Sequence, residues 1–152
     1  MKTSDIPVIE LSGTPRERGR MYGEMAKALI AEVVDAWRQD LGNYNPDNTG
    51  IKNDNPDAYL DAFLSQTNYL QSIQQWAPAL LEEMQGIAEG AVQDLNTILG
   101  LQLIDEEWVF GLRRGLAKPT HKCTAFGVPN QENGTGFAGQ NMDIPSWVEG
   151  KQ

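Results

Sequence analysis

Apolar residues recur every three or four positions through much of the first 112 residues, which is the spacing of one face of a helix. The first such stretch follows Thr14, which can cap a helix, with Pro15 suited to the first turn and Glu17 able to complete a capping box. The pattern predicts a helix from there to about Leu41, ended by Gly42. Its apolar positions include Met21, Tyr22, Met25, Ala28, Leu29, Val33, Ala36 and Trp37.

Three further helices are predicted after a loop rich in Asn, Asp, Gly and Pro at residues 42–55. The first begins at Asn55 and runs to about Gln75, the second begins near Pro78, and the third follows the capping residue Asp94 and runs to about Leu112. Charged residues in these segments fall away from the apolar positions. We therefore expect a packed helical layer without a buried charge.

Gly19 and Gly23 lie four residues apart inside the first predicted helix, where each glycine costs about 1 kcal/mol relative to alanine. Glycines at this spacing share one helix face and let another backbone approach closely. We expect close backbone packing there, and a ligand contact is the alternative interpretation.

Short alternating stretches predict strands at both ends of the chain. Residues 6–11 are typical of a short strand. After a linker at 117–121, a strand is predicted over 123–128, a turn over 129–136 that contains Asn133-Gly134, and a returning strand over 137–143. A two-stranded hairpin is marginally stable alone, so this one is expected to join a larger sheet.

Composition excludes several classes of function. The chain has 152 residues, enough for one domain with a core, and its 12 basic and 21 acidic residues give a net charge of −9. Such a charge disfavours nucleic acid and anionic lipid as partners. No run approaches the roughly 18 apolar residues of a membrane helix, and the N-terminus lacks a signal sequence, so we expect a cytoplasmic protein without membrane contact. One cysteine and one histidine suggest no disulfide and no metal site.

The single cysteine, Cys123, is the candidate nucleophile. A free cysteine is most often a small buried apolar residue. His121 lies two residues away, on the same face of an extended strand, but a thiol–imidazole pair of this kind lacks the distant base and orienting group of papain-like proteases. The pair alone is a weak signal of catalysis.

Four stretches of the sequence resemble the acyl-CoA:6-aminopenicillanic-acid acyltransferase family, which belongs to the N-terminal-nucleophile (Ntn) hydrolases. They occur in the family's order and extend from residue 13 to residue 143. The stretches are Gly13–Gly19 with Gly23, Gly86–Ala91 leading into Ile98-Leu99, Cys123–Gly127, and Gly139–Asp143. The resemblance implies an α+β protein with an αββα sandwich, of which this chain carries a helical N-terminal region and the first catalytic hairpin.

The resemblance also implies a precursor that cuts itself between Lys122 and Cys123. Cys123 would then attack an amide or thioester carbonyl through its thiol, with its own α-amine as general base and no cofactor. Asp143 would hold that amine by a hydrogen bond, and Gln140 and Asn141 would line the substrate pocket. The implied substrate is a small-molecule amide or an acyl-CoA-like thioester. An exposed aspartate at a strand end is the alternative interpretation of Asp143.

Under this interpretation, residues 1–122 form the helical pro-segment, or α-chain-like region, and residues 123–152 begin the catalytic β-chain-like region. The chain departs from the family at Lys122, where a glycine is frequent, and a bulky residue there is expected to slow the cleavage. The family's later strands, with the oxyanion-hole asparagine, have no counterpart within these residues. We expect the chain alone to be mostly α, incomplete and inactive, with the remaining β-chain portion as its partner.

The alternative function belongs to another class. The chain could be a non-catalytic helical interaction module that pairs with a partner through an exposed sheet edge. A new N-terminus at Cys123, or acylation of its thiol, would favour the enzyme. An unreactive buried thiol would favour the module.

Overall fold

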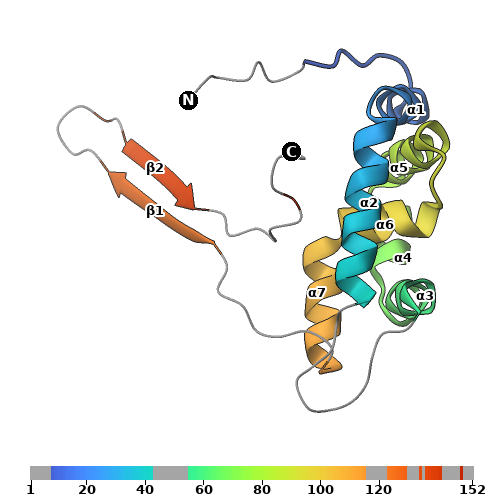
Figure 1. The fold of residues 1–152 in the computed structure, drawn as a ribbon. Coiled ribbons are helices and arrows are strands. Elements are labelled where there is room, and N and C mark those ends of the chain that lie inside the picture. Colours follow the sequence, from blue (N-terminus) through green and yellow to red (C-terminus); the bar gives the residue numbers. More distant parts are fainter. Residues whose placement is uncertain are drawn as a thin grey trace. The chain divides into compact units, whose positions relative to one another are not determined.

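The computed structural model describes residues 8–42, 55–115, 123–129, 134, 136–141 and 148. They belong to two compact units, Met1–Ala117 and Lys118–Gln152, shown in Figure 1. The first unit contains helices α1 (Pro15–Met25), α2 (Lys27–Gly42), α3 (Pro56–Gln66), α4 (Tyr69–Trp76), α5 (Pro78–Ala91), α6 (Leu95–Gln102) and α7 (Ile104–Arg113). The second contains strands β1 (Thr124–Pro129) and β2 (Gly136–Asn141).

Helix starts follow the predicted local signals. Thr14 accepts a hydrogen bond from the Glu17 backbone N–H, and the Glu17 carboxylate accepts from the Thr14 backbone N–H at 2.8 Å, which completes the capping box. Asn55 accepts from the Ala58 N–H at 3.1 Å, and α5 begins at Pro78. The predicted N-termini are therefore confirmed.

The predicted long first helix is wrong, because Ala26 divides it into α1 and α2. Ala26 has φ −95° and ψ 9°, yet its N–H still donates to the Tyr22 carbonyl at 2.8 Å and its carbonyl accepts from Ile30 at 2.9 Å. Figure 1 shows the two helices running in different directions. The physical reason is tertiary: α1 packs against α5, whereas α2 buries Val34 in the main core.

Two other predicted helices are also divided. The helix predicted over 55–75 breaks at Thr67, which is extended (φ −120°, ψ 162°) and whose hydroxyl donates to the Phe63 carbonyl at 2.7 Å. The helix predicted to run to Leu112 breaks at Leu103, between α6 and α7. Each break lets two short helices bury differently oriented apolar faces, which a single straight helix could not do.

No strand forms over Val8–Leu11, so the predicted leading strand is wrong for the part of it that the structure describes. Val8 is 86% exposed. A strand needs a neighbour for its backbone hydrogen bonds, and within the described residues this segment has none.

The core of the helical unit lies between α2, α3, α5 and α6. Trp37 and Phe63 are its largest fully buried side chains. Phe110 of α7 packs edge-on against Phe63, with ring centroids 5.4 Å apart, and against Tyr59 at 5.8 Å. The other buried members include Ile30, Val34, Leu64, Met84, Ala88, Ala91, Ile98 and Leu99.

Helices α1 and α5 cross through glycines on both sides. A Cβ added to Gly19 would lie 2.0 Å from the Glu83 carbonyl oxygen, and one added to Gly86 would lie 2.1 Å from the Arg16 carbonyl oxygen. Gly23 and Gly90 continue the same contact one turn later. Distances this short leave no room for a methyl group, so the predicted close backbone packing is confirmed.

The second unit is the predicted hairpin. β1 and β2 are antiparallel, with Thr124 paired with Asn141 and Pro129 paired with Gly136. Gly134 has φ +74°, the left-handed conformation that glycine favours in turns. The fold is thus mostly helical with one antiparallel hairpin, which agrees with the α+β class. Among the described helices, none is long and apolar enough to cross a membrane.

Candidate active site at the hairpin

Cys123 lies directly before β1, which starts at Thr124. Its thiol is free and exposed, so it is not the small buried residue that an isolated cysteine most often is. An exposed thiol at the start of a strand is accessible to a substrate carbonyl. The strand forms because the residues after Cys123, Thr124-Ala125-Phe126-Gly127-Val128, have a composition typical of a strand.

The hairpin brings Gln140 and Asn141 back beside Cys123. Gln140 pairs with Ala125 and Asn141 pairs with Thr124, so both lie within two residues of the cysteine in the ladder. The structure therefore brings three of the predicted site residues near one another along the backbone, but the register places Asn141 on the face of Phe126 and Gln140 on the opposite face. His121, Lys122 and Asp143 lie outside the described residues, so only the Cys123 side of the proposed cleavage bond is described.

The strands of the hairpin carry no charged residue. Phe126, Val128 and Phe137 lie on one face and are 61%, 53% and 69% exposed. The Phe126 ring covers Gly139, where an added Cβ would lie 2.5 Å from the ring. This contact stabilises the pairing across the strands. Within the described residues, nothing covers the remaining apolar surface of this face.

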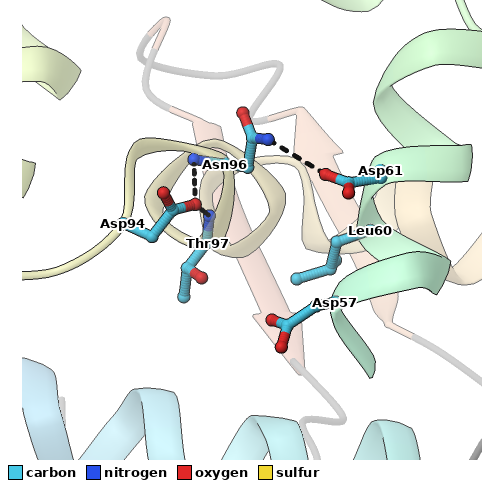
Figure 2. Close-up of a pocket in the computed structure, with 6 residues that line it drawn as sticks. All are labelled: Asp57, Leu60, Asp61, Asp94, Asn96 and Thr97. Carbon is cyan, nitrogen blue, oxygen red and sulfur yellow. Dashed lines mark hydrogen bonds between the residues drawn. The ribbon is translucent and has the colours of Figure 1, made fainter. Parts of the chain in front are cut away.

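The helical unit contains a pocket of about 320 Å³. Figure 2 shows its polar lining, in which the Asp94 carboxylate accepts from the backbone N–H groups of Asn96 and Thr97 at 2.9 and 3.3 Å. The Asn96 side chain donates to Asp61 at 3.1 Å. The lining residues are Asp57, Leu60, Asp61, Asp94, Asn96 and Thr97.

The polar groups of this pocket have structural partners. Asp94 caps α6, and Arg38 donates to Asp57 at 2.5 Å and to the Thr97 hydroxyl at 3.3 Å. No group of three or more acidic, histidine or cysteine side chains in the described ranges could hold a metal ion. Beside this pocket, Arg38 therefore links α2 to α3 and α6.

One buried charged residue was not predicted from the sequence. Glu107 of α7 is fully buried, contrary to the expectation of helices without a buried charge. The Tyr59 hydroxyl donates to its Oε1 at 2.5 Å and lies 3.3 Å from its backbone carbonyl oxygen. Glu107 lies three residues before Phe110 and four residues after Leu103, so it shares the apolar face of α7. This spacing could have predicted its burial.

Arg16 and Arg18 of α1 form ion pairs with Glu89 and Glu83 of α5. The Arg16 guanidinium, hydrogen-bonded to Glu89, lowers the pKa of that carboxyl, and Glu89 raises the pKa of Arg16. The Thr14 backbone N–H and then its hydroxyl lower the pKa of Glu17. Both effects stabilise helix ends and helix contacts, and neither concerns the residues of the hairpin.

A comparison with models of protein families and with curated proteins finds no match for this chain. The resemblance to the acyltransferase family therefore stays a prediction that rests on the four sequence stretches.

Proposed function

We propose that Cys123 is the nucleophile of an Ntn-type amidase or acyltransferase, within an αββα sandwich that the β1–β2 hairpin helps to build. The observation that carries the proposal is the free, exposed thiol directly before a strand whose partner returns Gln140 and Asn141 beside it. The resemblance of the four stretches to the family implies that self-cleavage comes first and acyl transfer second.

The first event is self-cleavage. The Cys123 thiol attacks the carbonyl carbon of Lys122, the C–N bond between the two residues breaks, and the nitrogen takes a proton to become the α-amine of Cys123. Water then hydrolyses the resulting thioester, which leaves a carboxylate on Lys122 and restores the thiol. Before this step Cys123 has no free amine, so the precursor is a zymogen.

The second event is acyl transfer. The thiol attacks the substrate carbonyl while its proton passes to the α-amine of Cys123, whose reference pKa of about 7.7–8.0 suits a base near neutral pH. The C–N or C–S bond of the substrate breaks, and the leaving amine or thiol takes the proton. Water or an acceptor amine then attacks the thioester and releases the acyl group. Asp143 holds the amine in position during both half-reactions.

Mass spectrometry tests the proposal on the longest open reading frame that contains these residues. We expect a polypeptide that begins at Cys123, and a mass increase on Cys123 after treatment with an acyl thioester. The matched control is Cys123→Ser, whose hydroxyl is a weaker nucleophile and should slow both events. An intact Lys122–Cys123 bond together with an unlabelled thiol would contradict the proposal.

A second function is favoured by one specific observation. Both strands of the hairpin are uncharged, and among their residues only Gly139 is partly covered. Edges of this kind pair readily with other strands. Under this alternative the chain is an interaction module that adds a partner strand, and Cys123 takes part in no reaction.

A further inference from the structure

Helix α1 is attached to the helical unit mainly through its crossing with α5. Its buried residues are Gly19 and Gly23, and both lie against the α5 backbone. Arg16 and Arg18 add ion pairs to the same helix. The hydrophobic core and the apolar side chains packed against it include none from α1. What holds α1 in place is therefore a surface of α5 that any copy of this chain also carries.

The residue that connects α1 to α2, Ala26, is close to a helical conformation. Its φ of −95° and ψ of 9° differ from the helical values of about −63° and −42° chiefly in ψ. The bonds from the Ala26 N–H to the Tyr22 carbonyl and from the Ile30 N–H to the Ala26 carbonyl already have the helical spacing of four residues. Residues 24–41 contain neither glycine nor proline. A change at Ala26 alone would thus join α1 and α2 into one helix, as the sequence pattern predicts.

Three large apolar side chains next to Ala26 are exposed. The exposed fractions are 36% for Tyr22, 62% for Met25 and 38% for Leu29. In a continuous helix this spacing of three and then four residues would place them on one face. In the observed form they flank the point where α1 and α2 change direction (Figure 1). The exposed apolar surface therefore lies at the connection that straightening would alter.

We propose that two copies of this chain exchange α1. In each copy Ala26 becomes helical, α1 leaves its own α5, and it crosses α5 of the other copy through the same glycines and ion pairs. Exchange of an identical element is a low-cost route to a dimer. With the two-fold axis beside the two Ala26 residues, Tyr22, Met25 and Leu29 of both copies cover one another. The exchange is independent of the chemistry proposed for Cys123.

The balance between the two forms depends on protein concentration. Each α1–α5 crossing is replaced by an identical one, so these contacts favour neither form. The short connection keeps α1 near its own α5 at an effective concentration of roughly millimolar, which favours the monomer in dilute solution. The continuous helix and the covered apolar side chains favour the dimer. We expect the exchanged dimer as the protein concentration approaches that range.

Substitution at the connection is the first test. All proteins are residues 1–152 with Val128→Lys, which weakens pairing through the hairpin, and light scattering measures the dissociation constant of the dimer. Ala26→Gly should raise it roughly 25-fold, about fivefold for each of the two connections that must become helical. The matched control is Ala31→Gly, which lies inside α2 in both forms and should change the constant by less than about twofold.

The second test makes the exchange obligatory. One variant carries Arg16→Glu and Arg18→Glu, and the other carries Glu83→Arg and Glu89→Arg. Each variant alone places like charges across its crossing, whereas exchanged helices in a mixed dimer pair opposite charges at both crossings. After joint unfolding in urea and refolding, the mixture should dimerise at least about tenfold more tightly than either variant alone. Pairing through the hairpin would give no such preference.

The outcomes decide the proposal. A protein that stays monomeric up to roughly 1 mM, or a dimer that Ala26→Gly and Ala31→Gly weaken equally, would overturn the exchange of α1. Equal dissociation constants for the mixture and the separate charge variants would also overturn it. Circular dichroism checks that the charge variants refold, and if either does not, the comparison of Ala26→Gly with Ala31→Gly decides alone.

Discussion

At the scale of single residues, Cys123 would supply two functional groups that other thiol enzymes take from two residues. Its thiol is free and exposed, and cleavage before it would create the α-amine that serves as base. Under the proposed function, a substitution at Cys123 would remove the nucleophile and also prevent the cleavage that creates the base.

We therefore predict that Cys123→Ala abolishes both self-cleavage and acyl transfer in the longest open reading frame. Denaturing gel electrophoresis and thioester turnover measure the two effects. The folded state should be unaffected, because the residue is exposed and lies outside the strand. Turnover retained by the purified variant would rule out Cys123 as the nucleophile.

Asp143 follows Asn141, the last residue of β2, by two positions, and lies outside the described residues. We predict that Asp143→Asn leaves the fold intact and lowers turnover, because the neutral amide holds the Cys123 amine less strongly than a carboxylate does. Thioester turnover measures the change in rate, and a circular dichroism spectrum checks that the fold is intact. A rate within about twofold of the parent, less than ~0.5 kcal/mol of barrier, would make Asp143 a surface charge.

At the scale of elements, the crossing of α1 and α5 fixes the start of the helical unit. Four glycines allow the two backbones to meet, and Arg16 and Arg18 of α1 reach Glu89 and Glu83 of α5 across the same contact. The Arg16–Glu89 pair is exposed and the Arg18–Glu83 pair is half-buried. Ion pairs at or near the surface contribute little, so the close packing carries most of the contact energy.

For Gly19→Ala, helix propensity and packing at the crossing predict opposite changes in stability. Gly19→Ala should stabilise an isolated helix by about 1 kcal/mol. In this protein the added Cβ would lie 2.0 Å from the Glu83 carbonyl oxygen, so we expect a net loss of about 1–3 kcal/mol in the free energy of unfolding. Urea unfolding followed by circular dichroism measures it. Gly127→Ala is the control, since its Cβ meets no atom within 4 Å.

The lowered pKa of Glu17 predicts a dependence of stability on pH. Its folded pKa lies below the ordinary value of 4.5, so its contribution is fully present above about pH 4.5 and is lost as the pH falls through the folded pKa. Glu17→Gln should therefore be less stable than the parent at neutral pH and should lose less stability on acidification. Thermal unfolding across this range measures the difference, with exposed Glu10→Gln as control. Parallel curves for parent and Glu17→Gln would contradict it.

Local signals explain why helix starts could be predicted and helix breaks could not. The caps at Thr14, Asn55 and Asp94 depend on residues within three positions, which the sequence displays directly. The breaks at Ala26 and Leu103 carry no glycine or proline, and they depend on which distant helix each half contacts. The same distinction applies to Glu107, whose burial depends on Tyr59, 48 residues away.

The part of the candidate site that lies within the hairpin could be predicted from the sequence. The alternation of the strands and the turn sequence place Gln140 and Asn141 beside Cys123 without reference to the helices. The division of the hairpin into a face with Phe126 and a face with Gln140 depends on the register. The sequence predicted the strand bounds and the turn but no pairing of residues, and a shift of the pairing by one residue would exchange the two faces.

At the scale of the whole molecule, the two units differ in how they satisfy their apolar groups. The helical unit encloses a core, with Trp37 and Phe63 almost fully buried. In the hairpin, Phe126, Val128 and Phe137 remain more than half exposed, and neither strand carries a charge that would discourage pairing with another strand. The behaviour of the chain in solution should follow from the hairpin.

We predict that residues 1–152, expressed alone, self-associate and show no amidase activity. We expect the exposed hairpin to pair with other copies, and the resemblance implies that the oxyanion-hole asparagine belongs to later strands of the family. Size-exclusion chromatography with light scattering should give multimers. Val128→Lys, which adds a charge to the apolar face, should shift the distribution toward monomer. Val92→Lys, at an exposed position of the helical unit, should leave it unchanged. A parent that is monomeric and unfolds cooperatively would show that the hairpin needs no further strand, and would favour the interaction module.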